Sequence, residues 1–354
     1  MPTRELLTFA MLAALGGCDP QVRGHVAANL NVGNDRQTLL SVITALLPFI
    51  GYPRTLNALA AVNEAAPASE KDSDMTAQKW LITGVSSGFG RELATQLLGR
   101  GDTVVGTVRR PDSVADLVEQ YPDTFHRELL DVTDATAVRD VVDSSFASLG
   151  RIDVVVSNAG YGLFGAAEEL SDEQVSHIIA TNLTGSIQLI RACLPHLRGQ
   201  GGGRIIQISS YGGQVAFPSN SMYHATKWGI EGFAESVAQE VAPFGIGVTI
   251  IEPGGARTEF RYQSAQVAQL LPAYDRTPAH GFLAMLDPAN GLAPGDPSRM
   301  AAAIIASAAQ EPAPLRIVLG AQALKTTLGV LKDRAASFET QADLAASADF
   351  PPGE

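Results

Sequence analysis

The chain has 354 residues, of which 45% are hydrophobic and 18% are charged, with a mean hydropathy of +0.09. This composition excludes a disordered, collagen-like or fibrous chain, and the length allows one large domain with or without a smaller partner. The net charge of −12 makes nucleic acid and anionic membranes poor partners for the surface as a whole, because both require a basic face.

The N-terminal part predicts a small all-helical unit over residues 1–63. Apolar residues recur there at three-and-four spacing, and glycines separate the helical stretches. The expected helices are Glu5–Gly16, Gln21–Leu30, Arg36–Pro48 and Tyr52–Asn63. A unit of this size is near the lower limit for a self-sufficient core, so we expect it to pack on something else.

The first apolar run, Leu6–Leu15, follows Arg4 and has the outline of a lipoprotein signal that would end at Cys18. Glu5 in the expected basic region and the unbroken helical pattern favour a buried first helix instead. No unbroken apolar run is long enough to span a membrane. Cys18 and Cys193 form no disulfide framework, which favours a reducing compartment. We therefore expect a cytoplasmic protein with no membrane partner, and the start of translation, Met1 or Met75, stays open.

Residues 64–75 are predicted to be a linker, because Glu64–Asp74 contains small and charged side chains and no large apolar one. From residue 76 to 354, short apolar runs alternate with helical stretches. The expected strands are Trp80–Thr83, Thr103–Val108, a weaker Phe125–Leu130, Ile152–Ser157, Arg204–Ser209, Ile246–Ile251 and Leu315–Leu319. Such strands suit a parallel sheet covered on both faces, so we predict an α/β fold, a doubly wound Rossmann domain with a small all-α N-terminal extension.

A glycine-rich turn, Thr83-Gly-Val-Ser-Ser-Gly-Phe-Gly90, connects the first expected strand to a helix that begins at Arg91. Glycines let the chain turn tightly and let a pyrophosphate approach the backbone, while the helix N-terminus supplies unpaired N–H groups. By itself such a turn is equally consistent with a simple strand-to-helix loop. Its place after the first strand of the domain favours a dinucleotide site.

The spacing T-G-x-x-x-G-x-G resembles that of the short-chain dehydrogenase/reductase family, and further motifs of that family follow in chain order. They are Asn158-Ala-Gly160, Asn182 in TNLTG, Ser210 in ISS, Y-x-x-x-K from Tyr223 to Lys227, and EPGGART from Glu252 to Thr258. The resemblance extends over residues 75–354 and is strongest to the hydroxysteroid-dehydrogenase-like branch. It implies that cofactor is bound by Gly84, Ser86, Ser87, Gly88, Phe89, Gly90, Asn158, Ala159, Gly160, Tyr223, Lys227, Pro253, Gly254, Ala256 and Thr258.

The residue types in these motifs suit hydride transfer to a carbonyl, which leaves negative charge on oxygen. Tyr223 can donate first a hydrogen bond and then a proton, provided that a cation stabilises its phenolate, and Lys227 lies on the same helix face. The resemblance implies that Ser210 binds the substrate oxygen, that Lys227 also holds the nicotinamide ribose, and that Asn182 helps to hold a water of a proton relay. Taken singly, each is more often an ordinary structural residue; the ordered set predicts a catalytic tetrad.

The end of the second expected strand predicts which cofactor is preferred. Val108 occupies the place where an NAD-binding member has an acidic residue, and Arg109 follows it. An arginine without a carboxylate suits a 2′-phosphate, so we predict NADP(H) over NAD(H). The alternative is that Arg109 and Arg110 form a solvated strand end. Asp131 and Val132 resemble the adenine contact of the family.

Residues 257–295 follow the sixth expected strand, where the family places its substrate loop, and they are rich in alanine, proline and aromatic residues. An apolar lid would favour a hydrophobic carbonyl or secondary alcohol; the alternative is an ordinary surface loop. The remaining histidines, His126, His177, His196, His224 and His280, show no metal-ligand spacing, so we interpret them as surface, loop or helix residues and predict no metal. His224, next to Tyr223, is expected to point off the catalytic face.

Residues 3–63 resemble the carboxymuconolactone decarboxylase-like helical proteins, in GGCDPQVRGHVAANLNVG and FIGYPRTLNAL. Redox-active relatives use a C-x-x-C pair and a following histidine. Here Cys18 and His25 are present, but Gln21 occupies the place of the second cysteine, so no dithiol cycle is available within this unit. We favour a degenerate module that packs or oligomerises over a second active site.

Three functions remain after these observations. The favoured one is an NADP(H)-dependent oxidoreductase, a carbonyl reductase or alcohol dehydrogenase, that acts on a small molecule and forms a homo-oligomer. A non-catalytic NADP(H) sensor or scaffold would be expected to lose a tetrad residue, and none of Asn182, Ser210, Tyr223 and Lys227 is lost. A bifunctional chain with a second chemistry in residues 1–63 is disfavoured by Gln21.

Overall fold

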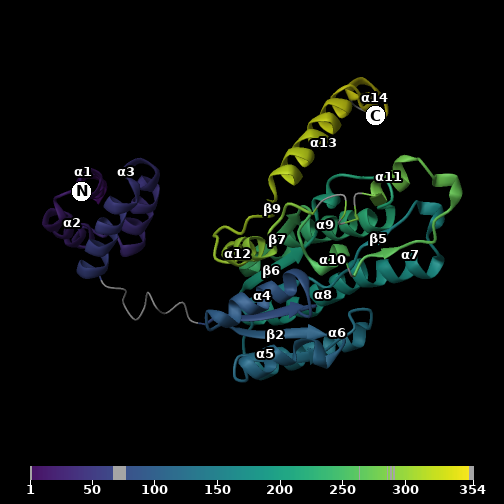
Figure 1. The fold of residues 1–354 in the computed structure, drawn as a ribbon, viewed down its shortest axis with the longest axis horizontal. Helices are drawn as coiled ribbons and strands as arrows, with labels where there is room; N and C mark the ends of the chain where they lie inside the picture. The colour runs from purple at the N-terminus through teal and green to yellow at the C-terminus, as the bar shows by residue number, and fades with distance from the viewer. Residues whose placement is uncertain are drawn as a thin grey trace. The chain divides into compact units, whose positions relative to one another are not determined.

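The computed structural model describes residues 2–66, 77–262, 264–284, 286, 287, 289 and 292–350. Contacts within the chain divide it into two compact units, Met1–Ala77 and Gln78–Glu354. The first unit contains helices, and the second contains a sheet with helices on its faces (Figure 1).

The first unit consists of α1 (Pro2–Leu15), α2 (Asp19–Asn31) and α3 (Arg36–Ala65). Helix α3 is interrupted at Gly51, whose φ of 73° and ψ of 169° are not helical, and this break separates the third and fourth helices expected from the sequence. Phe9, Val26 and Leu39 are fully buried in the core between the helices. The all-helical prediction is confirmed. Helix α3 includes residues 64 and 65 of the predicted linker, and residues 67–75 of that linker lie outside the described residues.

Much of the apolar surface of this unit is exposed. Helix α1, expected to be buried, buries only Phe9 and Ala13, and in α3 the Phe49 side chain is 85% exposed. Among the described residues, one helical segment, Thr38–Ala65, has the length and composition of a membrane span, although few of its residues are buried and Gly51 interrupts it. The expectations of a homo-oligomer and of no membrane partner therefore both stay predictions.

The second unit is built on a sheet of seven parallel strands in the order β3-β2-β1-β4-β6-β7-β9. Their bounds are β1 (Lys79–Thr83), β2 (Thr103–Val108), β3 (Phe125–Leu129), β4 (Val154–Ser157), β6 (Gly203–Ile208), β7 (Ile246–Pro253) and β9 (Arg316–Leu319). Each expected strand is present, and the weakest one is β3, where edge position explains the exposed side chains. The predicted doubly wound Rossmann fold is confirmed.

Helices cover both faces of the sheet. Helices α4 (Gly88–Gly99), α5 (Ala115–Gln120) and α12 (Pro297–Ser307) pack on one face, and α6 (Ala135–Leu149), α8 (Ser186–Gly199) and α9 (Ser221–Val241) pack on the other. Successive strand residues point to opposite faces, so Trp80 and Ile82 join the first core and Leu81 joins the second. All three are fully buried, which is why the strands read as unbroken apolar runs.

The remaining elements lie outside the main sheet and the six helices that cover it. They are β5 (Leu163–Phe164), α7 (Asp172–Ile178), a π-helical segment (Ile179–Gly185), short 3-10 turns, α10 (Glu259–Tyr262), β8 (Gln266–Val267), α11 (Pro278–Ala284), α13 (Ala321–Glu339) and α14 (Ala342–Ser347). β5 and β8 form a small parallel sheet of their own. The two ends of the predicted substrate loop, residues 257–295, lie close together. Ala256 and Gly295 form a β-bridge, and Arg257 Nε donates to the carbonyl oxygen of Ala293 at 2.8 Å.

Gly106 in β2 gives the first testable prediction. A Cβ at this position would lie 2.6 Å from Val85 Cγ2 and 2.7 Å from Phe125 Cε2, and both side chains are buried. We expect Gly106→Ala to lower the free energy of unfolding by about 1–3 kcal/mol. At Gly232, inside α9, the added methyl group would meet nothing within 4 Å, so Gly232→Ala should raise stability by up to about 1 kcal/mol. Denaturant unfolding of both variants measures this, and equal losses would contradict the packing argument.

Candidate functional site

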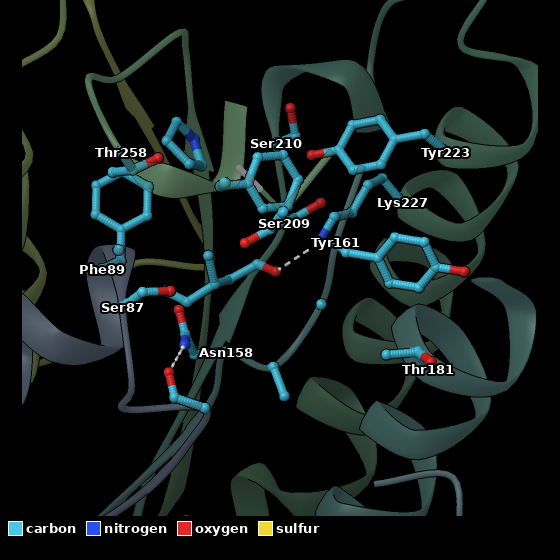
Figure 2. A pocket seen from close by; sticks show the side chains of 18 of the residues that line it. Ser87, Phe89, Asn158, Tyr161, Thr181, Ser209, Ser210, Tyr223, Lys227 and Thr258 are labelled. Carbon is cyan, nitrogen blue, oxygen red and sulfur yellow. Dashed lines mark hydrogen bonds between the residues drawn. The ribbon is translucent and has the colours of Figure 1, made fainter. Parts of the chain in front are cut away.

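A cavity of about 530 Å³ lies at the carboxyl ends of the central strands (Figure 2). It is lined by almost all of the residues predicted from the sequence: Gly84, Ser86, Ser87, Gly88, Phe89, Arg109, Asp131, Val132, Asn158, Ala159, Gly160, Ser210, Tyr223, Lys227, Pro253, Gly254, Ala256 and Thr258. Gly90 and Asn182 are the two predicted residues that do not line it. The fold thus brings together segments that are up to 174 positions apart, from Gly84 to Thr258.

The glycine-rich turn between β1 and α4 forms one end of the cavity. Gly84 and Gly88 have positive φ angles of 75° and 57°, which L side chains rarely adopt. A Cβ at Gly90 would lie 2.2 Å from the carbonyl oxygen of Gly84. Gly90 therefore lets α4 pack against the turn and does not itself line the cavity.

The side chain of Asn158 connects this turn to the neighbouring strand β4. Its Nδ2 donates to the carbonyl oxygens of Thr83 at 2.9 Å and Gly84 at 3.1 Å. In return, Thr83 Oγ1 accepts from the backbone N–H groups of Asn158 at 3.0 Å and Ala159 at 3.1 Å. Thr83 was not among the predicted site residues, although its place at the start of the T-G motif was a usable signal.

The residues at this end fit a dinucleotide. The strand order reverses between β1 and β4, where ligands bind in open α/β sheets, and α4 begins at Gly88 beside the cavity. The first N–H groups of α4 have no partner within the helix, and the positive end of the helix dipole lies there. The glycines leave space for phosphate groups against the backbone, so the turn suits a pyrophosphate.

The adenine-side residues lie at the ends of β2 and β3. Arg109 is exposed, lines the cavity and forms no ion pair or hydrogen bond with another residue that the structure describes, whereas Val108 is buried. Asp131 Oδ1 accepts from the Thr133 N–H at 2.9 Å and from Thr133 Oγ1 at 2.8 Å. The Thr133 N–H chiefly, with help from the Thr133 hydroxyl and the charge of Arg109, lowers the pKa of Asp131.

Ser210, Tyr223 and Lys227 converge at the other end of the cavity. In Figure 2 the hydroxyl groups of Ser210 and Tyr223 face the same part of the cavity. Ser210 lies at the end of β6, and its Oγ accepts from the Gly212 N–H at 3.0 Å. Tyr223 and Lys227 lie one turn apart on α9, with Lys227 Nζ 5.7 Å from the centre of the tyrosine ring.

Burial governs the acid–base behaviour of this pair. It raises the pKa of Tyr223 to about 12, with Ser210 opposing the shift. It lowers the pKa of Lys227 to about 8, against the charge of Glu231, and Lys227 Nζ donates to the carbonyl oxygen of Ile208 at 3.0 Å. We expected a cation to favour the tyrosinate, but burial is the dominant influence on Tyr223 and favours the neutral phenol.

Asn182 lies in the π-helical segment and is buried. Its Oδ1 accepts from the Tyr161 N–H at 3.0 Å, and its Nδ2 donates to the Tyr161 carbonyl oxygen at 2.8 Å. Both polar groups of the side chain thus hold the backbone of Tyr161, which lines the cavity. The side chain of Asn182 therefore shapes the wall through Tyr161, and the water-holding role that the resemblance implies stays a prediction.

Sequence reasoning missed an aromatic wall formed by Phe164, Phe217, Phe260 and Phe282, all of which line the cavity. It also placed His224 off the catalytic face, whereas His224 is buried and lines the same cavity. In the sequence, the only indication of these rings is their position: they follow the motifs at the strand ends or lie in the predicted substrate loop.

His224 holds this wall in place. Its Nδ1 donates to the Gly212 carbonyl oxygen at 2.7 Å, and its Nε2 accepts from the Phe217 N–H at 3.0 Å. Burial lowers the pKa of His224, against the Gly212 hydrogen bond, so the neutral ring that can accept from Phe217 is favoured.

In the helical unit, the residues singled out from the sequence have structural partners. Cys18 Sγ donates to the Leu12 carbonyl oxygen at 3.2 Å, and His25 Nδ1 lies 3.0 Å from Glu5 Oε2. Within the part of the chain that the structure describes, no three His, Cys, Asp or Glu residues are arranged to hold a metal ion. The expected absence of a metal stays a prediction.

Comparison with known families identifies the larger unit. Residues 78–268 match the family model described as short chain dehydrogenase. The chain belongs to the short-chain dehydrogenase family. It is an oxidoreductase with the fold of a nicotinamide-dependent enzyme. Residues 1–64 of this short-chain dehydrogenase match the carboxymuconolactone decarboxylase family.

Several relatives are similar to this short-chain dehydrogenase in sequence. Oxidoreductase BOA17 of Botryotinia fuckeliana is 37% identical over 70% of this chain and 90% of its own length. The 3-ketodihydrosphingosine reductase of Bacteroides thetaiotaomicron is 39% identical over 52% of this chain and 66% of its own length. Human 17-beta-hydroxysteroid dehydrogenase type 1 is 33% identical over 57% of this chain and 63% of its own length.

Two solved structures extend the comparison. A short-chain dehydrogenase from Streptomyces avermitilis is 40% identical, with a TM-score of 0.72 over 78% of this chain and all of its own. A structure titled ElxO with NADP bound is 25% identical, with a TM-score of 0.56 over 69% of this chain and 98% of its own.

The lowered pKa of Lys227 predicts how stability varies with pH. Between about 8, the folded value, and 10.5, the usual value, the unfolded chain binds more protons than the folded one, so stability rises with pH. We expect the rise in unfolding free energy between about pH 7.5 and about pH 9.5 to be about 1–3 kcal/mol smaller in Lys227→Met. Lys325→Met, at an exposed position on α13, is the control. Denaturant unfolding measures the difference, and identical pH profiles for Lys227→Met and the native chain would refute it.

Proposed function

We propose that this short-chain dehydrogenase transfers a hydride between NADP(H) and a hydrophobic carbonyl compound or secondary alcohol. The observation that carries the proposal is that the hydroxyls of Ser210 and Tyr223 face one cavity whose other end is the glycine-rich turn of α4. When bound, the nicotinamide supplies or accepts the hydride. Side chains of the protein bind the substrate oxygen and donate or accept the proton.

In the direction of reduction, the protein stabilises the substrate oxygen and then protonates it. The Ser210 hydroxyl donates a hydrogen bond to the carbonyl oxygen, which polarises the carbonyl. The Tyr223 phenol donates the proton as negative charge develops, because an alkoxide is more basic than a phenolate. The ammonium group of Lys227, 5.7 Å from the centre of the tyrosine ring, favours the phenolate that remains. Oxidation reverses each step.

The walls of the cavity support a hydrophobic substrate. Aromatic side chains of Phe164, Phe217, Phe260 and Phe282 face it beside Tyr223. The names of two relatives give different substrates, a 3-ketodihydrosphingosine and a hydroxysteroid, so these names do not point to one substrate class. The support for a hydrophobic substrate comes from the cavity. A sensor or scaffold would need no such arrangement of a proton donor, a lysine and an apolar wall.

The preference for NADP(H) is proposed from Arg109. The guanidinium is exposed at the cavity and, among the described residues, forms no ion pair or hydrogen bond with an acid, although its charge reaches Asp131. The preceding Val108 offers no carboxylate to a ribose hydroxyl. An arginine with free donors suits a 2′-phosphate. We place no second reaction in the helical unit, because Cys18 and His25 are both engaged by neighbouring groups and Gln21 replaces the second cysteine.

Tyr223→Phe tests the reaction. We expect NADPH consumption with a panel of ketones and aldehydes to fall by at least about 100-fold, because the proton donor is lost. NADPH binding, measured by calorimetry, should change little, since the phenyl ring remains. Tyr121→Phe, at a position that does not line the cavity, should behave like the native chain. Tight NADPH binding without turnover of any carbonyl by the native chain would favour the sensor function instead.

Arg109→Ala tests the cofactor preference. We expect the ratio of kcat/KM for NADPH over NADH to fall by about tenfold or more, because a charge-assisted contact to the 2′-phosphate is lost. Arg110→Ala, the adjacent exposed arginine that does not line the cavity, should keep the native ratio. A native ratio in Arg109→Ala would show that the assignment of this residue is wrong.

A further inference from the structure

The segment between β7 and α12 forms a cover over the substrate end of the cavity, and its first half is joined to the β5 region. The Gln266 N–H donates to the Gly162 carbonyl oxygen at 2.9 Å, and the Ala268 N–H donates to the Phe164 carbonyl oxygen at 2.8 Å. Phe164 thus lies in the strand to which the cover is attached, and its ring lines the cavity.

A buried carboxylate joins the rest of the cover to the same region. The side chain of Glu169 is 0% exposed, and its Oε2 accepts from the Ala166 N–H at 2.7 Å. Its Oε1 accepts from the Leu271 N–H at 2.7 Å and lies 2.7 Å from His280 Nε2 on α11. One side chain therefore fixes two points of the cover, Leu271 before α11 and His280 within it.

The groups around this carboxylate favour the contact between a charged Glu169 and a charged His280. Burial alone would raise the pKa of Glu169, but the hydrogen bonds from Leu271, His280 and Ala166 together lower it. The hydrogen bond with Glu169 raises the pKa of His280, and the exposed Asp275, 3.2 Å from His280 Nδ1, adds to the shift. The Tyr274 ring, which is also titratable, packs on His280 with 6.1 Å between ring centres.

Helix α11 carries Phe282, two residues after His280, against two other rings of the cavity. The ring centres of Phe282 and Phe217 are 5.9 Å apart with planes inclined by 21°, and those of Phe282 and Phe164 are 6.4 Å apart with planes inclined by 27°. Ser219 Oγ donates to the Ala279 carbonyl oxygen at 2.8 Å and holds the start of α11. Phe282 therefore stacks on two other rings, and all three rings line the cavity that Tyr223 and Ser210 also line.

We propose that Phe164, Phe217 and Phe282 form an aromatic slot that selects flat, ring-containing carbonyl substrates, and that Glu169 is the positioning residue that keeps Phe282 in this slot. The proposal rests on the proposed carbonyl chemistry of the same cavity. A flat aromatic ring gains offset stacking on these rings in addition to its apolar burial. A puckered saturated ring of the same size gains only the burial.

Two methyl ketones of equal carbon number test the slot: phenyl methyl ketone, which is flat, and cyclohexyl methyl ketone, which is puckered. In the native chain kcat/KM should favour the phenyl compound, and in Phe282→Leu this preference should fall about fivefold, as the loss of one stacking partner predicts. Phe244→Leu, at a half-exposed ring on the surface outside the cavity, should keep the native preference. A preference that is unchanged in Phe282→Leu would overturn the slot.

Glu169→Gln tests the positioning residue, because an amide keeps the shape but supplies only one accepting oxygen. The phenyl preference should fall through a higher KM for the phenyl compound, with Glu173→Gln on α7 as the control. If Glu169 acts through Phe282, adding Glu169→Gln to Phe282→Leu should cause almost no further loss of preference. Losses that multiply in the double variant would show that Glu169 supports the fold in general and does not position Phe282.

Binding separates the failure of the slot from the failure of the reaction. In Tyr223→Phe loaded with NADPH, calorimetry should still find tighter binding of the phenyl than of the cyclohexyl ketone, and Phe282→Leu added to it should reduce this preference about fivefold. Selective binding without turnover in the native chain would contradict the proposed reaction and leave the slot standing. Turnover of both ketones with equal binding would contradict the slot and leave the reaction standing.

Discussion

The side-chain amide of Asn158 donates hydrogen bonds to the carbonyl oxygens of Thr83 and Gly84, and through them it joins the ends of β4 and β1. β1 and β4 are parallel neighbours, and the strand order reverses between them, so this junction lies where ligands bind in open α/β sheets. Because the turn is fixed there, the backbone of Gly84 and the start of α4 at Gly88 face the same cavity as Ser210 and Tyr223. The glycine-rich turn is thus a consequence of tertiary contacts as well as of its own residue types.

Next to Lys227 on α9, Glu231 belongs to a cluster of buried charges with Glu252 and Arg316. Glu231, one turn after Lys227, accepts from Ser209 Oγ at 2.5 Å and forms an ion pair with Arg316 of β9. Burial, and then the charge of Glu231, raises the pKa of Glu252 at the end of β7, which also pairs with Arg316. The cluster ties α9 to two strands and opposes the loss of the Lys227 proton, so the acid–base behaviour of the site depends on residues that do not line it.

The two ends of the cavity are built in different ways. The dinucleotide end consists of strand ends and one helix N-terminus, where backbone groups of the glycine-rich turn are available to a ligand. The substrate end consists of side chains from inserted segments, which are held by Glu169, His224 and Asn182. None of these three contacts was expected from the sequence, because each joins a polar side chain to a segment whose place depends on the fold. The glycine-rich turn and the residues Ser210, Tyr223 and Lys227 could be predicted to share one site, whereas the walls of the substrate end could not.

The sequence by itself determined the order of helices and strands, the doubly wound class and most residues of the cavity, because apolar periodicity and turn chemistry are local. Even the weak run at Phe125–Leu130 forms a strand, at the edge of the sheet. Only the tertiary structure decided that Gly90 packs under the turn and that Glu169 meets His280, 111 positions later. It also decided that burial raises the pKa of Tyr223, because desolvation depends on which segments cover a residue.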